Sequence, residues 1–221
     1  GVMKKYLAEF LATFTLVFVG VGAIMMQAHT GGGVGWLGIA LAHGLAIGLM
    51  VCVTGHISGG HINPAVTISM LATKHIGLKD GGLYIVSQLL GACFGAWLLS
   101  IAFPAGLAAA VNFGTPALTA GFGFGTGILL EAVLTFFLVL VIFATTLDSR
   151  GPKNLAPFAI GLAITMGILI GGPITGGAMN PARYFGPALL SGNWMDCGVY
   201  WAGPLLGGLL AGLVYDRFLK N

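Results

Sequence analysis

Charged residues are scarce in this sequence. Only 7% of the 221 residues are Asp, Glu, Lys or Arg, whereas soluble domains carry roughly 25%. The mean hydropathy is +0.98, and apolar runs of about 20 residues recur from end to end, which leaves no stretch polar enough to fold in water. The sequence therefore predicts one membrane domain over residues 1–221 and argues against soluble domains.

Cysteine is also rare. Cys52, Cys93 and Cys197 lie in or near apolar segments and show no CxxC spacing, so neither a disulfide framework nor a zinc site is indicated. We expect free, mostly buried thiols. The five histidines form no HExxH pattern, and the glycine-rich piece HTGGGVG lacks the lysine of a phosphate-binding loop. We therefore expect no enzyme, no metal and no cofactor.

The formal net charge of +3 does not indicate a nucleic-acid partner, because the basic residues stand in small groups at the ends of apolar runs. Membrane topology explains them better. If the N-terminus lies in the cytoplasm, eight of the nine basic residues fall on the inner side. We therefore expect both termini in the cytoplasm. The eight residues are Lys4, Lys5, Lys74, Lys79, Arg150, Lys153, Arg217 and Lys220.

Six apolar segments are long enough to cross a bilayer as helices. The first is too long for a cleaved signal peptide and carries Glu9. Two further segments, 63–72 and 180–190, would reach only about 15 Å as helices, roughly half of the hydrocarbon thickness. The sequence thus predicts an all-α membrane protein with two half-spanning, re-entrant helices. The six long segments are 4–28, 35–55, 81–103, 122–147, 155–171 and 196–218.

The two halves of the chain resemble each other, and their alignment places Glu9 opposite Glu131. The two copies cover about 4–105 and 119–221, and each holds three full spans. Because three is an odd number, the second copy crosses the membrane in the opposite orientation to the first. The two short helices would then meet near the midplane from opposite faces. The matched pieces are LAEFLATFTLV with LLEAVLTFFLV, SGGHINPAV with TGGAMNPAR, and YIVSQLLG with YWAGPLLG.

Each short segment begins with Asn-Pro-Ala. Asparagine caps a helix, and proline in the first turn sacrifices no hydrogen bond. The non-helical backbone before such a helix is tolerated at membrane depth only inside protein or along a water-filled cavity. One such motif is common at turns, but two copies in register indicate a functional pair. The residues are Asn63, Pro64, Ala65, Asn180, Pro181 and Ala182.

With these motifs, in SGGHINPAVT and GGAMNPARYFGPAL, nearly the whole chain resembles the aquaporin (major intrinsic protein) family. The resemblance implies the aquaporin fold, a passive channel for water and small neutral solutes, and a homotetramer with a pore in each subunit. Aquaporins themselves illustrate pore selectivity by hydrogen-bond donors and electrostatic barriers. The two asparagine amides would hold a passing water by its oxygen, and the helix N-termini would repel protons and cations.

Arg183 is the ninth basic residue and lies far from the membrane-edge groups. A guanidinium at the bilayer centre costs about 2.5–3.5 kcal/mol, so it should sit in protein or water. In the family this position is the arginine of the outer constriction, and motif spacing gives it the companions His43, Ile168 and Gly177. An arginine that only binds carbonyls, and a His43 that only packs, are the alternative interpretations.

This set of four differs from strict water channels, which have an aromatic and then a histidine at the first two positions. Glycerol facilitators have an Asp after the arginine, where this chain has Tyr184. The set is most similar to plant tonoplast intrinsic proteins, some of which pass ammonia as well as water. Ile168 opposite Gly177 should widen the filter, so we expect water to pass and ammonia or another small neutral solute to follow. Pro116 or a neighbour stands where that group often has a second histidine.

Glu9 and Glu131 are carboxylates inside spans, which often indicates proton-coupled transport. Their equivalent places in the repeat, and the family resemblance, imply instead that each accepts hydrogen bonds from one re-entrant segment, with Glu9 near His61. A glycerol- or urea-type facilitator and a membrane-junction structural protein are the other candidate functions. The outer connections are short and offer little surface for docking.

Overall fold

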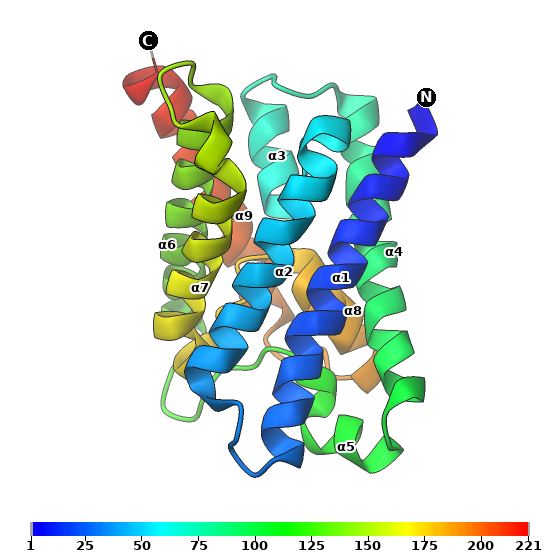
Figure 1. The fold of residues 1–221 in the computed structure, drawn as a ribbon. Helices are drawn as coiled ribbons and strands as arrows, with labels where there is room; N and C mark the ends of the chain where they lie inside the picture. The colour runs from blue at the N-terminus through cyan, green and yellow to red at the C-terminus, as the bar shows by residue number, and fades with distance from the viewer. Residues whose placement is uncertain (1, 221) are drawn as a thin grey trace.

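The computed structural model describes residues 2–220, and every regular element in this range is helical (Figure 1). Six helices are long and apolar enough to span a membrane, which confirms the predicted all-α membrane fold. The long helices are α1 (Val2–His29), α2 (Gly35–Ser58), α4 (Leu78–Ala102), α6 (Phe124–Ile142), α7 (Ala156–Thr175) and α9 (Cys197–Val214), and the short ones are α3 (Pro64–Ala72), α5 (Ala105–Ala110) and α8 (Pro181–Ser191).

The long helices pack in equivalent pairs in the two halves. α1 lies along α4, α6 lies along α9, and α2 packs against both α1 and α7. Gly91 and Gly207 show how close these contacts are, because a Cβ at either would overlap a carbonyl group, of Phe10 or Ala132 respectively. Small residues at these positions let the helix backbones touch, which is how membrane helices gain packing energy.

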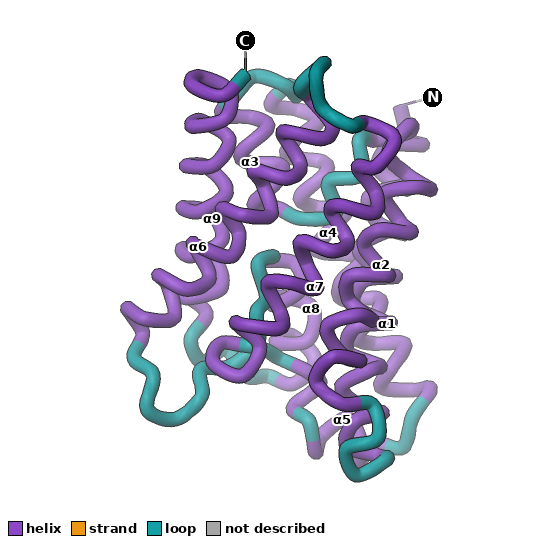
Figure 2. The backbone as a smooth tube through the Cα atoms, turned by 60° about the vertical axis from the view of Figure 1, so that its left-hand side comes forward, coloured by secondary structure: helices purple, strands orange, loops and turns teal. Residues whose placement is uncertain are grey.

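The two short helices that begin with Asn-Pro-Ala cross between the halves. α3 packs against α9, and α8 packs against α4. Figure 2 shows the loops that precede them near mid-height of the bundle, while both chain ends lie at one end of it. Each short helix is therefore held by a helix from the other half of the sequence.

The connection between α4 and α6, residues 104–121, contains α5 and a tight left-handed turn. The AGLAAA sequence explains α5, since alanine and leucine are strong helix formers. Three consecutive residues then adopt positive φ: Asn112 (50°), Phe113 (54°) and Gly114 (66°). A left-handed aromatic residue carries strain of about 1–3 kcal/mol, which the surrounding contacts must offset.

The expectation of mostly buried thiols is wrong. Cys52 is exposed, and Cys93 and Cys197 are half-buried. Apolar character does not distinguish a core-facing position from a lipid-facing one in a membrane helix, because both are apolar.

At the end of the bundle that carries both termini, polar bonds join the loop after α6 to the C-terminal turn. The Arg150 guanidinium donates to Asp148 Oδ2 at 2.6 Å and to Leu219 O at 2.7 Å. Hydrogen bonds from Arg150 hold the pKa of the Asp148 carboxyl well below its usual range. The C-terminal turn is thus fastened beside the 148–153 loop.

Candidate functional site

Both short helices start with an asparagine cap followed by proline. The Asn63 side chain accepts from Ala65 N at 2.9 Å, and the Asn180 side chain accepts from Ala182 N at 3.0 Å. Both asparagines have extended backbones and are followed by proline at the first helical position. These caps satisfy otherwise unpaired N–H groups at each helix start, as the motif predicts.

Each asparagine also binds the loop of the opposite half. Asn63 Nδ2 donates to Met179 O at 2.7 Å, and Asn180 Nδ2 donates to Ile62 O at 3.0 Å. Ile62 and Met179 have positive φ, 60° and 51°, a conformation that is strained for bulky residues. Because an amide carries two N–H donors, each asparagine retains one that this bond does not use. The cross-bonds thus hold the two helix starts together and fix the amides.

Glu131 and Glu9 are fully buried, and each holds the loop that precedes one short helix. Glu131 accepts from Thr175 Oγ1 at 2.6 Å, Ala178 N at 2.9 Å and Met179 N at 2.7 Å. Glu9 accepts from the equivalent groups of the first half. Neither carboxylate lines the cavity that contains His43 and Arg183 or the one that contains His61, so the geometry favours a supporting role over proton transport.

Glu9 contacts the His61 backbone rather than its ring. It accepts from His61 N at 3.0 Å, Ile62 N at 2.7 Å and Ser58 Oγ at 2.6 Å. Gln88 Nε2 adds a fourth bond at 2.8 Å. The His61 ring bonds Thr67 Oγ1 through Nδ1 at 3.0 Å. Glu9 thus lies beside His61, and it is the His61 backbone N–H that donates to it.

Arg183 lies at the start of α8 and is buried within the protein rather than in lipid. Its Nη1 donates to Gly114 O at 2.8 Å, and its Nε donates to His43 Nε2 at 3.2 Å. The positive φ at Gly114 directs this carbonyl, and a Cβ there would approach Val21 Cγ1 to 2.9 Å. The left-handed turn in the 104–121 connection therefore orients the guanidinium.

The His43 ring is fixed at both nitrogens. Nδ1 lies 2.9 Å from the Ile39 carbonyl and must carry a hydrogen, while Nε2 accepts from Arg183 and must not. His43 is therefore a neutral imidazole, and protonating Nε2 would set it against the guanidinium. Gly20 makes room for the ring, since a Cβ there would overlap it.

Ile168 lies near His43 and Arg183, and Gly177 is buried behind it. Ile168 and these two residues line one cavity. Gly177 has φ 58°, and a Cβ on it would approach Ile168 Cα to 3.1 Å. Three of the four predicted filter residues thus line the same cavity. The fourth, Gly177, has no side chain, and this lets its backbone lie close to Ile168.

Two cavities approach the asparagine pair from opposite ends. The distal cavity, about 380 Å³, contains His43, Ile168 and Arg183 and also Pro116. The terminal cavity, about 600 Å³ and near the chain ends, reaches His61, two residues before Asn63. The loop before α3 contributes His61 to the terminal cavity, and the start of α8 contributes Arg183 to the distal one.

Sequence reasoning did not find several supporting residues. Gly114, Gln88 and Trp36 all contact the site from distant segments. The repeated tyrosines Tyr84 and Tyr200 were visible in the aligned pieces, and each donates to the last carbonyl of α2 or α7, at 2.8 and 2.6 Å. The repeat was the only signal that could have revealed them.

Three features together define a membrane channel. Asparagines at two helix starts bind the loops of the opposite halves, buried carboxylates hold those loops, and one arginine lines a cavity. Residues 1–215 match the major intrinsic protein family, and the chain belongs to this family. It is an integral multi-pass membrane channel and not an enzyme.

Relatives and a solved structure agree with this assignment. Aquaporin TIP4-4 of Zea mays is 46% identical over 224 residues, which cover 98% of this chain and 86% of that protein. The probable aquaporin TIP2-1 of Oryza sativa subsp. japonica is 44% identical over 230 residues, covering 99% and 89%. The X-ray structure of the aquaglyceroporin from Plasmodium falciparum has a TM-score of 0.87 at 26% identity, covering 99% of this chain and 97% of that one.

Mercury is expected to inhibit the channel only weakly. The described filter wall carries no thiol, and Cys52 lies on the wall of the wide terminal cavity. Placing a thiol in the filter by Ile168→Cys, in a Cys52→Ser background, should produce strong block that a thiol reductant reverses. Osmotic shrinkage of proteoliposomes with and without HgCl₂ measures this, and strong block of the Cys52→Ser parent would contradict it.

Proposed function

We propose that the protein is a passive water channel that excludes ions and protons and that also passes ammonia. The cross-bonded pair Asn63 and Asn180 carries this proposal. Their remaining N–H donors suit the oxygen of a passing water, whose hydrogens must then point away from the centre. Such a water cannot relay a proton along the file, and the helix N-termini add positive potential at the same point.

Arg183 supplies the second barrier to cations. It is the one fixed positive charge in the distal cavity, as far as the described residues line it, because the neighbouring His43 is held neutral by its two hydrogen bonds. A cation would have to pass this guanidinium in a confined space, where charges interact more strongly than in bulk water. Neutral molecules of the size of water meet no such barrier.

The composition of the filter supports ammonia as a second solute. Both nitrogens of His43 are engaged, and Ile168 offers an apolar side chain where strict water channels have a polar one. The filter therefore offers few hydrogen bonds to replace those that a solute loses when it leaves water. This favours a small solute that makes fewer hydrogen bonds with water than urea or glycerol does. A glycerol- or urea-type facilitator is the competing function.

Solute fluxes into proteoliposomes test this proposal. Wild-type vesicles should shrink quickly in an osmotic gradient and take up ammonia, seen as a rise in internal pH. The double variant His43→Phe with Ile168→His should keep water flux and lose most of the ammonia flux. Ammonia uptake equal to that of empty vesicles would reduce the function to water alone, and faster glycerol or urea than ammonia transport would favour the facilitator.

We further propose a homotetramer with both termini in the cytoplasm. The family resemblance supports the tetramer, and the basic residues near the terminal end support the orientation. In this arrangement the terminal cavity opens to the cytoplasm, and Arg183 lies toward the outer side.

A further inference from the structure

Trp36 lies at the beginning of α2 and lines the distal cavity, seven residues before His43. Its indole Nε1 donates to Ile168 O on α7 at 3.2 Å. The side chain is still 39% exposed, so it joins two spanning helices at the cavity rim. The bond belongs neither to the asparagine pair nor to the contacts that hold Arg183 and His43.

Gly172 provides the seat for the indole ring. A Cβ at Gly172 would overlap the six-membered part of the ring, with Cε2 at 2.7 Å and Cη2 at 2.9 Å. Gly172 lies one helical turn beyond Ile168, so the ring contacts α7 at the same level as its hydrogen bond. Trp36 therefore binds α7 in two ways: its ring packs on Gly172, and its indole N–H donates to Ile168 O.

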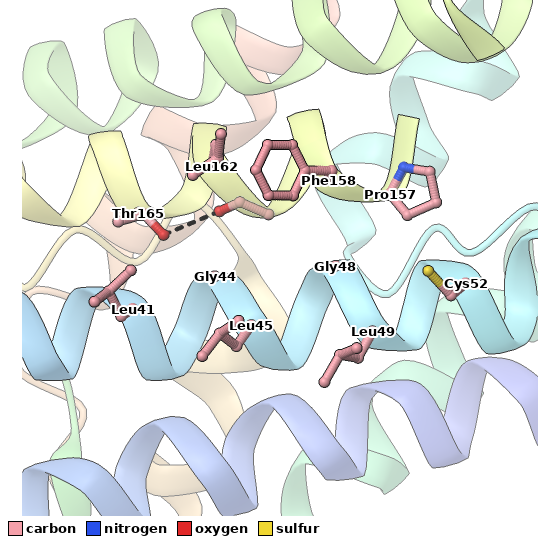
Figure 3. Close-up of a pocket in the computed structure, with 11 residues that line it drawn as sticks. Leu41, Gly44, Leu45, Gly48, Leu49, Cys52, Pro157, Phe158, Leu162 and Thr165 are labelled. Atoms are coloured by element: carbon pink, nitrogen blue, oxygen red, sulfur yellow. Dashed lines mark hydrogen bonds between the residues drawn. The ribbon is translucent and has the colours of Figure 1, made fainter. Parts of the chain in front are cut away.

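The spacing between α2 and α7 sets the position of two filter residues. His43 belongs to α2, and Ile168 belongs to α7. Near mid-depth the helices touch through Gly44 and Gly161, where a Cβ on either would overlap the other helix. Figure 3 shows Gly44 and Gly48 facing α7 in this contact.

Beyond the filter, α7 is weakened by Pro173. Proline has no N–H, so it leaves the carbonyl four residues earlier without its helical donor. Trp36 binds α7 immediately before this weak turn. The glycine contact thus fixes the helix spacing on one side of Ile168, and the indole fixes it on the other.

We propose that Trp36 is a positioning residue that sets the gap between His43 and Ile168, and thereby the size limit for neutral solutes. The proposal rests on the function proposed above, since it concerns the selectivity of the same pore. Trp36 acts through Ile168 by holding its backbone, and Gly172 is required because the ring needs its space.

Two variants test this role with the full-length protein in liposomes. Trp36→Phe keeps a ring over Gly172 but removes the N–H. We expect the ratio of urea to water permeability to rise by up to about fivefold, the factor to which one net hydrogen bond corresponds. Gly172→Ala should displace the indole and raise the same ratio, but should add nothing in a Trp36→Ala background. Trp97→Phe is the matched control, because Trp97 packs against Phe94 on α4.

The permeability ratio separates positioning from a general loss of stability, because fewer folded channels lower both fluxes together. An unchanged ratio in Trp36→Phe, whatever the absolute fluxes, would overturn the inference, as would an equal rise in Trp97→Phe. Wild-type water flux no faster than that of empty vesicles would instead refute the proposed function.

Discussion

Glu131→Gln is expected to destabilise the protein more than Glu9→Gln, although the two carboxylates hold equivalent loops. In either variant, an amide N–H₂ replaces one acceptor oxygen and leaves a buried backbone donor unpaired, at a cost of about 1–3 kcal/mol. At Glu9 there is a compensating partner. Gln88 donates to Glu9, and its own Oε1 has no partner in the described structure.

A rotation of the Gln88 amide would present Oε1 to the N–H₂ group that Glu9→Gln introduces and recover one hydrogen bond. The Thr67 hydroxyl, which accepts from Gln88 Nε2 at 3.0 Å, would then turn to donate to the same Oε1. In the second half, the aligned piece YWAGPLLG places Pro204 where the first half has Gln88, and proline has no side-chain acceptor. Melting temperatures of the detergent-solubilised variants measure the difference. Adding Gln88→Leu to Glu9→Gln should lower its melting temperature to that of Glu131→Gln. Equal melting temperatures of Glu9→Gln and Glu131→Gln would contradict the explanation.

The same Glu9→Gln protein distinguishes a support from a proton-transport group. A residue that only holds backbone N–H groups should leave water flux per folded channel nearly unchanged. Loss of all flux from a folded Glu9→Gln channel would instead support the proton-coupled alternative considered from the sequence.

Arg183→Val should produce the second large effect, which is a leak of cations. A unit charge about 4 Å from a passing cation contributes about 4 kcal/mol at an effective dielectric of about 20, or roughly a thousandfold in rate. Removing the guanidinium also frees Gly114 O and His43 Nε2, which adds two acceptors that suit a cation. Proton flux driven by a potassium diffusion potential measures the leak.

Arg217→Val is the matched control, because it removes the same charge at an exposed position near the C-terminus. The helix starts at Asn63 and Asn180 still oppose cations in Arg183→Val, so the increase should fall below the full thousandfold. Proton flux equal to wild type in Arg183→Val would show that these helix starts alone exclude protons.

The sequence predicted those parts of the fold that local patterns encode. Helix starts at Asn63 and Asn180 follow from cap chemistry, and segment lengths separate spanning helices from short ones. The bond between Arg183 and His43 joins residues 140 positions apart, and no local pattern specifies such a pair. Family spacing grouped them, but the single protonation state of His43 follows only from its hydrogen bonds with Ile39 O and Arg183 Nε.

The left-handed turn at Gly114 shows another limit. Glycine permits positive φ, but Asn112 and Phe113 have no such preference strong enough to predict three consecutive left-handed residues. The conformation is stable because tertiary contacts, such as the hydrogen bond from Arg183 to Gly114 O, offset its strain. Strain of this kind is invisible in sequence until its partner is known.

The crossed packing of the short helices has a consequence for biosynthesis. The chain leaves the ribosome from its N-terminus, yet α3 completes its packing only against α9, the last long helix. Until the second half is made, Asn63 also lacks the Met179 carbonyl to which its amide donates in the complete protein. The order of translation thus leaves the pore incomplete until α8 and α9 have been made.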